Sequence, residues 1–288
     1  MDVLLPRSLS EALEMKAEHP EAVPIAGGTD LMVELNFDRR RPERMMDVSR
    51  LPELRVWRRE DGHLFLGAGV TYSRIIAELR EFRPLVEASR TVGSPQIRNR
   101  ATVGGNLGTS SPAGDALPVL AAYNAEVVLA RAGGHTRAVP FARFMSGPKK
   151  TAMDPAELIL GARWRIVPGL GSFSKIGPRN AMVIAVANLC LVVDVAGRTV
   201  RVALGSVGPT ILRAPDAEVF AARSLAAAGW WEDRSASLSP AVIEEFGERV
   251  AAAARPIDDV RGTARYRRLA CAVLARRALA WALADRSA

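Results

Sequence analysis

The stretch Thr102-Val-Gly-Gly-Asn-Leu-Gly-Thr-Ser-Ser-Pro-Ala-Gly-Asp115 carries most of the evidence about fold. It is rich in glycine and in hydroxyl side chains, and the apolar run 116–122 follows it. Because glycine lacks a Cβ, Gly104 and Gly105 are expected to turn successive N–H groups inward as an anion-binding nest. A phosphate or a diphosphate suits such a loop. An ordinary tight turn has the same composition, so both interpretations stand at this point.

A second glycine pair lies near the N-terminus, in Val23-Pro-Ile-Ala-Gly-Gly-Thr-Asp-Leu31. Its apolar start predicts a short strand that leads into Gly27 and Gly28, with a helix over 31–35. Two such loops can hold one diphosphate from both sides. Neither has the lysine of a Walker loop or the G-x-G-x-x-G spacing of a Rossmann fingerprint, so the usual nucleotide-binding folds are disfavoured.

Local signals predict several elements around these loops. Ser8-Leu-Ser-Glu11 has the form of a capping box and predicts a helix that ends before Pro20. Asp61-Gly62 separates a predicted strand that begins at Trp57 from another over 64–68 and predicts a hairpin. Thr71 is expected to cap a helix that reaches Leu79.

In combination, the motifs resemble the FAD-binding medium subunit of the molybdenum hydroxylases, a family that includes xanthine dehydrogenases, carbon monoxide dehydrogenase and N-heterocycle oxidoreductases. The resemblance covers nearly the whole chain. It rests on Ala26-Gly-Gly-Thr-Asp30, Ser94-Pro-Gln-Ile-Arg-Asn-Arg-Ala-Thr-Val-Gly-Gly-Asn106, Ser111-Pro-Ala-Gly-Asp115 and Ala254-Arg-Pro-Ile-Asp-Asp-Val-Arg-Gly-Thr-Ala-Arg-Tyr-Arg-Arg268.

The resemblance implies an α+β fold with two domains. The first, over 1–168, is an FAD-binding domain of the vanillyl-alcohol oxidase/p-cresol methylhydroxylase type, with subdomains at about 1–56 and 57–168. The second, over 172–288, is the small C-terminal domain of these flavoproteins. The segment Pro168-Gly-Leu-Gly171 is the expected boundary between them.

The patterns of the C-terminal part predict a small antiparallel sheet over 173–176, 181–195 and 199–207, with helices over 239–254 and 263–284 packed against it. One stripe of the last helix repeats at three- or four-residue steps and is therefore expected in the core. The stripe consists of Leu269, Val273, Leu274, Arg277 and Trp281.

The resemblance also implies which residues bind FAD, without a covalent bond. These are Ile25, Ala26, Gly27, Gly28, Thr29, Asp30, Leu31, Ala101, Thr102, Gly104, Gly105, Asn106, Thr109, Asp115, Ile159, Leu160 and Lys175.

A specific role is predicted for four of these residues. Asp115 is expected to accept a hydroxyl of the cofactor, with an N-cap for the next helix as the alternative. By resemblance, Lys175 lies near the flavin pyrimidine and favours reduction, whereas an isolated lysine is more often solvated. Ile159 and Leu160 are expected to pack on the flavin ring.

Two arginines precede the central stretch. Arg98 and Arg100 are candidates for phosphate contacts, and pairing with surface carboxylates is the alternative.

The implied function is electron transfer. The chain would pass electrons from [2Fe-2S] clusters of a small partner subunit, through FAD, to NAD, oxygen or another acceptor. The molybdenum cofactor belongs to a large partner subunit, and a dimer of such three-subunit units is typical of the family. No catalytic residue and no metal site are expected in this chain. Xanthine or another purine is the first expectation for the substrate of the whole enzyme.

Other functions stay open. Within the family, carbon monoxide and N-heterocycle or aldehyde dehydrogenases also have medium subunits of this kind. A freestanding FAD-dependent reductase, similar to the enolpyruvyl-UDP-glucosamine reductases, needs its own acid or base, and no convincing candidate is present. A non-enzymatic basic nucleic-acid-binding protein is the third alternative.

Composition limits these alternatives. The chain has 288 residues and a net charge of +8, which fits an anionic cofactor, an acidic partner subunit or a plain solvated surface. Aromatic residues make up only 6%, too few for a base-stacking platform, so nucleic acid is not an expected partner. The two cysteines lie apart, the three histidines are scattered, and no apolar run is long enough for a membrane span. A cytoplasmic location is expected.

Overall fold

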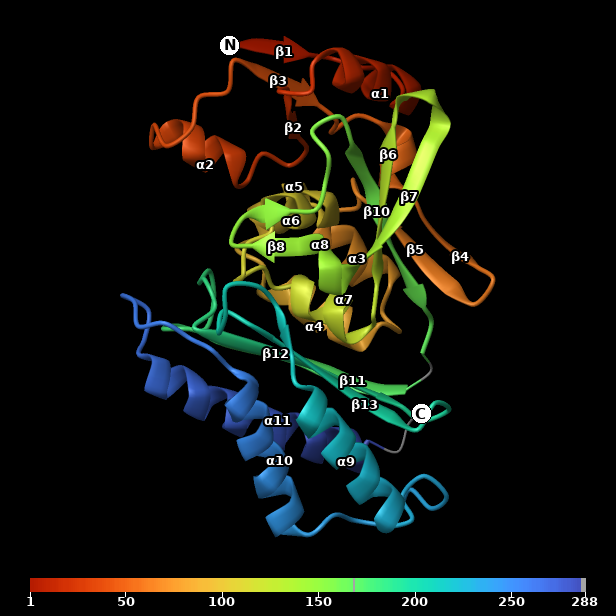
Figure 1. The fold of residues 1–288 in the computed structure, drawn as a ribbon, viewed down its shortest axis with the longest axis vertical. Coiled ribbons are helices and arrows are strands. Elements are labelled where there is room, and N and C mark those ends of the chain that lie inside the picture. The colour runs from red at the N-terminus through yellow and green to blue at the C-terminus, as the bar shows by residue number, and fades with distance from the viewer. Residues whose placement is uncertain (168, 286–288) are drawn as a thin grey trace. The chain divides into compact units, whose positions relative to one another are not determined.

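A computed structural model describes residues 1–167 and 169–285 (Figure 1). The chain forms two compact units, and both are assembled from separate pieces of sequence. Unit 1 contains Met1–Leu79, Val92–Ser111 and Asn124–Ile166. Unit 2 contains Arg80–Thr91, Pro112–Tyr123 and the chain from Val167 onward. The expected domain boundary includes Pro168, which lies outside the described residues, and the division into domains at this point stays a prediction.

Unit 1 begins with a small parallel sheet in the order β1-β3-β2. Buried Ala12 and Leu13 form a hydrophobic cluster together with Met46 of the sheet. The elements are β1 (Asp2–Leu4), α1 (Leu9–Glu18), β2 (Val23–Ile25), α2 (Leu31–Asn36), β3 (Arg44–Asp47) and a 3-10 turn, η1 (Pro52–Arg55).

The larger sheet of unit 1 is antiparallel, in the order β4-β5-β10-β6-β7. Its strands are β4 (Trp57–Glu60), β5 (His63–Gly67), β6 (Glu126–Arg131), β7 (His135–Pro140) and β10 (Leu158–Arg165). The other elements are α3 (Tyr72–Glu78), α5 (Pro95–Arg100), α6 (Val103–Thr109), η2 (Ala132–Gly134), α8 (Phe141–Phe144), β8 (Met145–Gly147) and β9 (Lys150–Thr151).

Unit 2 is built on an antiparallel sheet in the order β11-β12-β13-β14. Every residue of β12 is buried, because helices contact both faces of the sheet. Its strands are β11 (Gly169–Ile176), β12 (Ala187–Asp194), β13 (Thr199–Gly205) and β14 (Leu212–Arg213). Its helices are α4 (Arg83–Thr91), α7 (Leu117–Ala122), α9 (Pro215–Ala227), α10 (Pro240–Ala253) and α11 (Ala264–Ala284). The predicted α+β class is therefore confirmed.

Three local predictions are confirmed. The Ser8 hydroxyl caps α1 by accepting the N–H of Glu11 at 3.2 Å. The hairpin of β4 and β5 turns at Asp61-Gly62, and the Thr71 hydroxyl caps α3. Each of these signals is contained within a few residues, so the surrounding fold does not override it.

The expected core stripe of α11 is wrong. Leu269 is 58% exposed and Trp281 is 48% exposed, whereas Leu274 is buried. Small residues lie close to the sheet instead, so the buried face consists of Ala270, Cys271, Leu274, Ala275, Ala278, Leu279 and Ala282. In an alanine-rich helix, several faces show the same spacing, and the packing partners decide which one is buried.

Two further differences concern unit 2. The strand expected over 181–195 begins at Ala187, and residues 181–186 form an irregular segment before it. Helix α9 was not predicted, although Pro215 stands at its first turn and Asp216 and Glu218 follow.

Candidate cofactor-binding site

The first glycine loop, residues 26–31, follows β2 in unit 1. Gly28 has φ +76°, a left-handed conformation that glycine adopts without strain. Position 27 requires glycine for a different reason. A Cβ on Gly27 would lie 2.0 Å from the carbonyl oxygen of Arg100, so no larger residue fits unless the backbone moves.

Among the described residues, the backbone N–H groups of Gly27, Gly28, Thr29 and Asp30 have no hydrogen-bond acceptor. The first three of these residues are half-buried, and Asp30 is exposed. Successive unpaired donors in a turn favour an anion with several oxygens. The first glycine loop therefore fits a diphosphate.

The second glycine segment, residues 101–109, differs from the prediction because most of it is the helix α6 and not a loop. The Thr102 hydroxyl caps this helix and accepts the N–H of Gly105 at 3.0 Å. The N–H of Gly104 donates to the carbonyl oxygen of Ala68 at 2.8 Å. The nest expected at Gly104 and Gly105 is therefore wrong, since protein acceptors already take both N–H groups.

The glycines of α6 have two roles: Gly104 allows close packing, and Gly105 and Gly108 leave the exposed face of the helix without side chains. A Cβ on Gly104 would lie 2.5 Å from the Cβ of Ala68, so this glycine allows the helix to pack closely. Gly105 and Gly108 are exposed and, three residues apart, share one helix face. That face carries bare backbone. A Cβ on Gly108 would lie 3.8 Å from the Cδ1 of Ile159, which places Ile159 beside the bare face.

The two glycine segments converge within unit 1. Gly27 packs against the backbone of Arg100 and Ala101, and the Thr109 hydroxyl donates to the Asp30 carboxylate at 2.9 Å. Two contacts made by one lysine add to this connection. The N–H of Lys149 donates to the carbonyl oxygen of Ser110 at 3.1 Å, and its ammonium group pairs with Glu34 of α2 at 2.6 Å. The expected convergence is confirmed.

Asn106 of α6 supplies one polar atom without a partner. Its side-chain oxygen is buried and accepts no hydrogen bond from any described residue. Buried polar atoms of this kind usually have a donor, often from water or a ligand. A donor on a bound cofactor would satisfy Asn106.

The other residues of unit 1 that are expected to contact FAD are partly covered by the protein itself. The N–H of Ala68 donates to the carbonyl oxygen of Leu160 at 2.8 Å, and Leu160 and Ile159 are half-buried. Ile25 and Ala26 are also half-buried, and Leu31 begins α2.

In unit 2, Asp115 and Lys175 form a buried ion pair. The Lys175 Nζ lies 2.6 Å from Asp115 Oδ2, and the side chains are only 7% and 8% exposed. Lys175 also donates to the carbonyl oxygen of Thr91 at 3.1 Å. Burial raises the pKa of Asp115, and the positive charge of Lys175 opposes that rise.

Asn188 completes this pair. Its amide donates to Asp115 Oδ1 at 3.2 Å, so both carboxylate oxygens have a partner. The alternative N-cap role of Asp115 is wrong, because Ala116 is the N-cap of α7 and no side chain caps that helix. The prediction missed Asn188, whose only signal is its position as an amide inside an otherwise apolar strand.

The two arginines before α6 differ. Arg98 Nη1 donates to the carbonyl oxygens of Val92 and Gly93, each at 3.1 Å, which is neither a phosphate nor a carboxylate contact. Arg100 is exposed, and its side chain has no partner among the described residues. Backbone carbonyls thus hold part of the Arg98 side chain, and the phosphate contact of either arginine stays a prediction.

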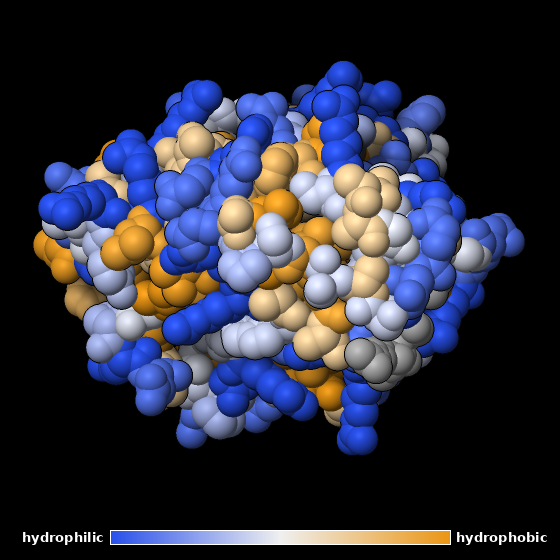
Figure 2. All heavy atoms as spheres, turned by 90° about the horizontal axis from the view of Figure 1, so that it is seen from below, coloured by the Kyte–Doolittle hydropathy of each residue, from blue (hydrophilic) through white to orange (hydrophobic). Residues whose placement is uncertain are grey.

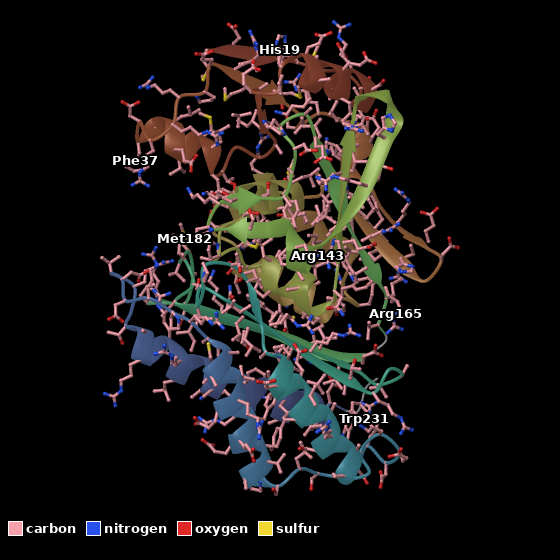
Figure 3. All side chains as sticks on the ribbon, viewed as in Figure 1. His19, Phe37, Arg143, Arg165, Met182 and Trp231 are labelled. Atoms are coloured by element: carbon pink, nitrogen blue, oxygen red, sulfur yellow. The ribbon has the colours of Figure 1, made fainter. Side chains whose placement is uncertain are left out.

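Within the described ranges, no cluster of His, Cys, Asp or Glu could hold a metal ion, and no helix is long and apolar enough to cross a membrane. His19, labelled in Figure 3, lies 3.7 Å from Glu21 and contacts Arg44. Both cysteines are buried, and burial raises the pKa of Cys271 to about 12.

Comparison with known proteins agrees with this geometry. Residues 1–163 match the family described as the FAD binding domain in molybdopterin dehydrogenase. Residues 232–282 match the CO dehydrogenase flavoprotein C-terminal domain.

Three relatives illustrate the range of the family. The carbon monoxide dehydrogenase medium chain of Hydrogenophaga pseudoflava is 30% identical, over 96% of both chains. The nicotinate dehydrogenase FAD-subunit of Eubacterium barkeri is 34% identical, over 67% of this chain and 69% of its own. The xanthine dehydrogenase FAD-binding subunit of Escherichia coli O157:H7 is 30% identical, over 73% and 75%.

The solved carbon monoxide dehydrogenase from Hydrogenophaga pseudoflava superposes with a TM-score of 0.85 at 27% identity, over 99% of this chain and 97% of that one. This likeness confirms the predicted FAD-binding fold. The chain therefore belongs to the family of FAD-binding medium subunits of the molybdenum hydroxylases, whose members are flavoprotein subunits of oxidoreductases.

Proposed function

We propose that this chain holds FAD at the two glycine segments and transfers electrons within a molybdenum hydroxylase. The [2Fe-2S] clusters lie on a small partner subunit and the molybdenum cofactor on a large one. Residues 1–168 form the FAD-binding domain and residues 172–288 the C-terminal domain, and the enzyme works in the cytoplasm.

One observation carries the FAD assignment: four successive N–H groups without acceptors, at Gly27 to Asp30, next to the glycine-bearing face of α6. The N–H groups bind the diphosphate oxygens, and the missing side chains at Gly105 and Gly108 leave room for the rest of the cofactor. Bound FAD exchanges one or two electrons, so it can join one-electron clusters to a two-electron acceptor.

The remaining proposed contacts follow from the same geometry. In unit 1, Ile159 lies beside the bare face of α6 and supplies an apolar surface for the flavin ring, together with Leu160. Asn106 accepts a hydrogen bond from the cofactor.

The contacts proposed from unit 2 depend on the buried ion pair. Asp115 accepts a hydroxyl of the cofactor while Lys175 and Asn188 hold its carboxylate. Lys175 places a positive charge that favours flavin reduction. Because opposite charges in a buried site orient each other, loss of either side chain would misplace the other.

Xanthine or another purine is the proposed substrate of the whole enzyme. Its support is the likeness of the first glycine loop and of the Gln96-Ile-Arg-Asn99 motif to xanthine dehydrogenase subunits. The relatives named for carbon monoxide and nicotinate make those substrates the direct competitors.

The proposed acceptor is NAD, oxygen or another carrier. The family resemblance implies paired basic and then acidic residues after the position of Lys175, whereas this chain has Arg179-Asn-Ala-Met182 there. Arg179 donates to the carbonyl oxygens of Ala181 and Met182, at 3.1 and 2.6 Å. The Arg179 side chain is therefore hydrogen-bonded within its own segment.

The test is an absorption spectrum of the purified chain, followed by release and identification of the cofactor. Stoichiometric, non-covalent FAD is the expected result, and a colourless chain that does not take up added FAD contradicts the proposal. The substrate is tested separately. Xanthine, nicotinate and carbon monoxide are each added to the complete enzyme while flavin reduction is followed, and reduction by xanthine alone is expected.

A further inference from the structure

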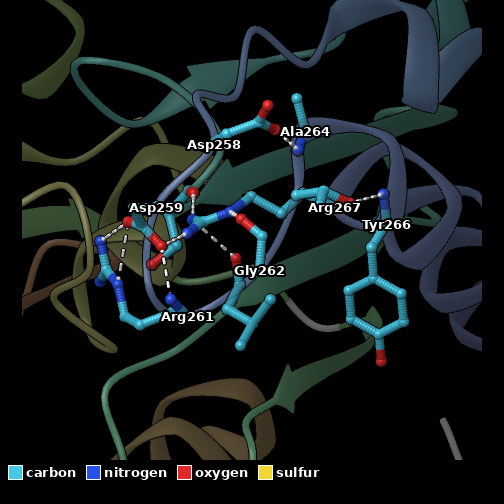
Figure 4. Close-up of polar contacts among 10 residues, drawn as sticks. Asp258, Asp259, Arg261, Gly262, Ala264, Tyr266 and Arg267 are labelled. Carbon is cyan, nitrogen blue, oxygen red and sulfur yellow. Dashed lines mark hydrogen bonds and ion pairs between the residues drawn. The ribbon is translucent and has the colours of Figure 1, made fainter.

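A turn in unit 2 just before α11 is fixed by a buried arginine. Arg267 is 1% exposed, and its Nη1 donates to the carbonyl oxygens of Val186 and Ser206, at 3.1 and 2.6 Å (Figure 4). Its other terminal nitrogen pairs with Asp259 at 2.5 Å. A single side chain thus ties the turn to both ends of the segment that contains β12 and β13.

The turn is also closed on itself. Asp259 and Gly262 exchange backbone hydrogen bonds at 3.2 and 3.1 Å, and the Asp258 carboxylate accepts the N–H of Ala264. Arg261 pairs with Asp259 at 2.6 Å, and this contact holds the pKa of that carboxyl well below its usual range. The turn is therefore ordered.

This ordered turn exposes apolar side chains. Val260 at its tip is 104% exposed, and Ile257 is 71% exposed. Around the contact between Val186 and Gly262, further apolar side chains are exposed on the segment before β12 and on the first turns of α11. We define the turn patch as Met182, Ile184, Ile257, Val260, Tyr266 and Leu269. Met182 is labelled in Figure 3.

The charges around the turn patch are mostly positive. Arg255, Arg265 and Arg268 are exposed, and within the described part of the chain their side chains have no hydrogen-bond or ion-pair partner. The nearby carboxylates of Asp258 and Asp259 already have partners. Figure 2 shows that apolar residues are exposed between hydrophilic ones on the face of the molecule that is seen from below.

We infer that the turn patch is the docking surface for a partner subunit whose own face carries aliphatic side chains beside carboxylates. The inference rests on the proposed function, in which this chain works with other subunits. Fixed, exposed apolar side chains form effective contact points because little conformational entropy is lost when they are covered. Unpaired arginines select an acidic partner. A second copy of this chain fits poorly, because it would bring the same arginines together.

The experiment compares two exposed valines in the full chain, tagged and purified from its native host. Val260→Asp places a carboxylate at the tip of the turn patch. Val219→Asp is the control, since Val219 is 51% exposed on α9 and lies outside the patch. FAD, molybdenum and iron are measured per chain, because the two metals identify the partner subunits by their cofactors.

The wild-type chain and Val219→Asp are expected to carry FAD, molybdenum and iron. Val260→Asp should keep its FAD and lose both metals by about tenfold or more, as for a residue at the centre of an interface. The double variant with Arg265→Glu and Arg268→Glu should also lose the metals. Its difference from the wild-type chain should shrink at higher salt, because salt screens the repulsion between the new carboxylates and those of the partner.

Several outcomes would overturn the inference. They are retention of both metals by Val260→Asp, an equal loss in Val219→Asp, or a wild-type chain that carries FAD without either metal. A dimer that Val260→Asp dissociates would assign the patch to a second copy, and bound nucleic acid would assign it to a different partner class. A wild-type chain without FAD contradicts the proposed function itself, so the two failures are distinguishable.

Discussion

In the first glycine loop, four backbone N–H groups from Gly27 to Asp30 have no acceptor among the described residues. In the second glycine segment, the N–H groups of Gly104 and Gly105 donate to Ala68 and Thr102. Both segments pair two glycines with polar residues. The first has donors without an acceptor, and the second presents a helix face without side chains.

The comparison shows that a glycine pair has several physical uses. Gly28 is required by its positive φ, and Gly27 by a carbonyl oxygen that would lie 2.0 Å from its Cβ. Gly104 is required for close packing on Ala68, whereas Gly105 has only the Thr102 hydroxyl near its Cβ position, at 3.3 Å. Substitutions at these positions should therefore have different effects on the free energy of unfolding.

Gly27→Ala should have the largest effect. The added Cβ forces the first glycine loop away from Arg100, and overpacking of this kind costs about 3 kcal/mol or more where the obstacle is backbone. The free energy of unfolding, measured with denaturant, and the FAD content should both decrease. A Gly27→Ala chain as stable as wild type would contradict the close approach of the two segments. Gly27→Val and Gly104→Val are poor tests of cofactor binding alone, because both collide with the protein itself.

Thr109→Val removes the hydrogen bond to Asp30 and keeps nearly the same shape. The expected cost is about 1 kcal/mol in the free energy of unfolding, with a loss of FAD affinity of up to roughly tenfold. Fluorescence titration with FAD gives the affinity. Thr136→Val on β7, where Thr136 is exposed, is the control and should leave both quantities unchanged. An equal loss in the control would remove the special role of the Thr109 contact.

Gly105→Ala should separate stability from binding. Alanine in a helix is more favourable than glycine by roughly 0.5–1 kcal/mol, so the free energy of unfolding should increase. FAD affinity should decrease, because the new Cβ lies on the bare face of α6. A stabilised chain with unchanged affinity would mean that this face does not contact the cofactor.

Acid should weaken the connection between α2 and the second glycine segment slightly. The hydrogen bond from Lys149 lowers the pKa of Glu34 below its model-compound value of 4.5. Because the pKa is lowered in the folded state, the pair stabilises the fold fully at pH values above 4.5. This stabilisation disappears as the pH falls through the folded-state pKa of Glu34. Because Lys149 is 61% exposed, the effect should be at most about 1 kcal/mol.

The measurement for this pair is the free energy of unfolding as a function of pH. Wild type should lose slightly more stability than Lys149→Met on acidification. Identical pH dependences of the two proteins would exclude a stabilising role for the pair.

Signals contained within a few residues predicted local structure well. The Ser8 and Thr71 caps and the Asp61-Gly62 hairpin are examples, and the motifs of the two glycine segments identified the family. The convergence of the segments was inferred from the two glycine pairs together with the family resemblance, since nothing local to Gly27 indicates that Arg100 lies against it.

The remainder depends on tertiary contacts that a single sequence does not show. α6 was missed because its three glycines disfavour a helix, whereas the Thr102 cap and the close packing of Gly104 on Ala68 stabilise it. The buried face of α11 was misassigned because alanines occur on every side of that helix. The pair of Asp115 and Lys175 joins residues far apart in sequence, and no local pattern indicates it.

Amide hydrogen exchange of the chain with and without FAD tests the central difference most directly. Without FAD, the amides of Gly27 to Asp30 should exchange fast, and bound FAD should slow them strongly. The amides of Gly104 and Gly105 should be protected in both states, because their acceptors are part of the protein. Unchanged exchange at Gly27 to Asp30 on FAD binding would show that the first glycine loop does not hold the diphosphate.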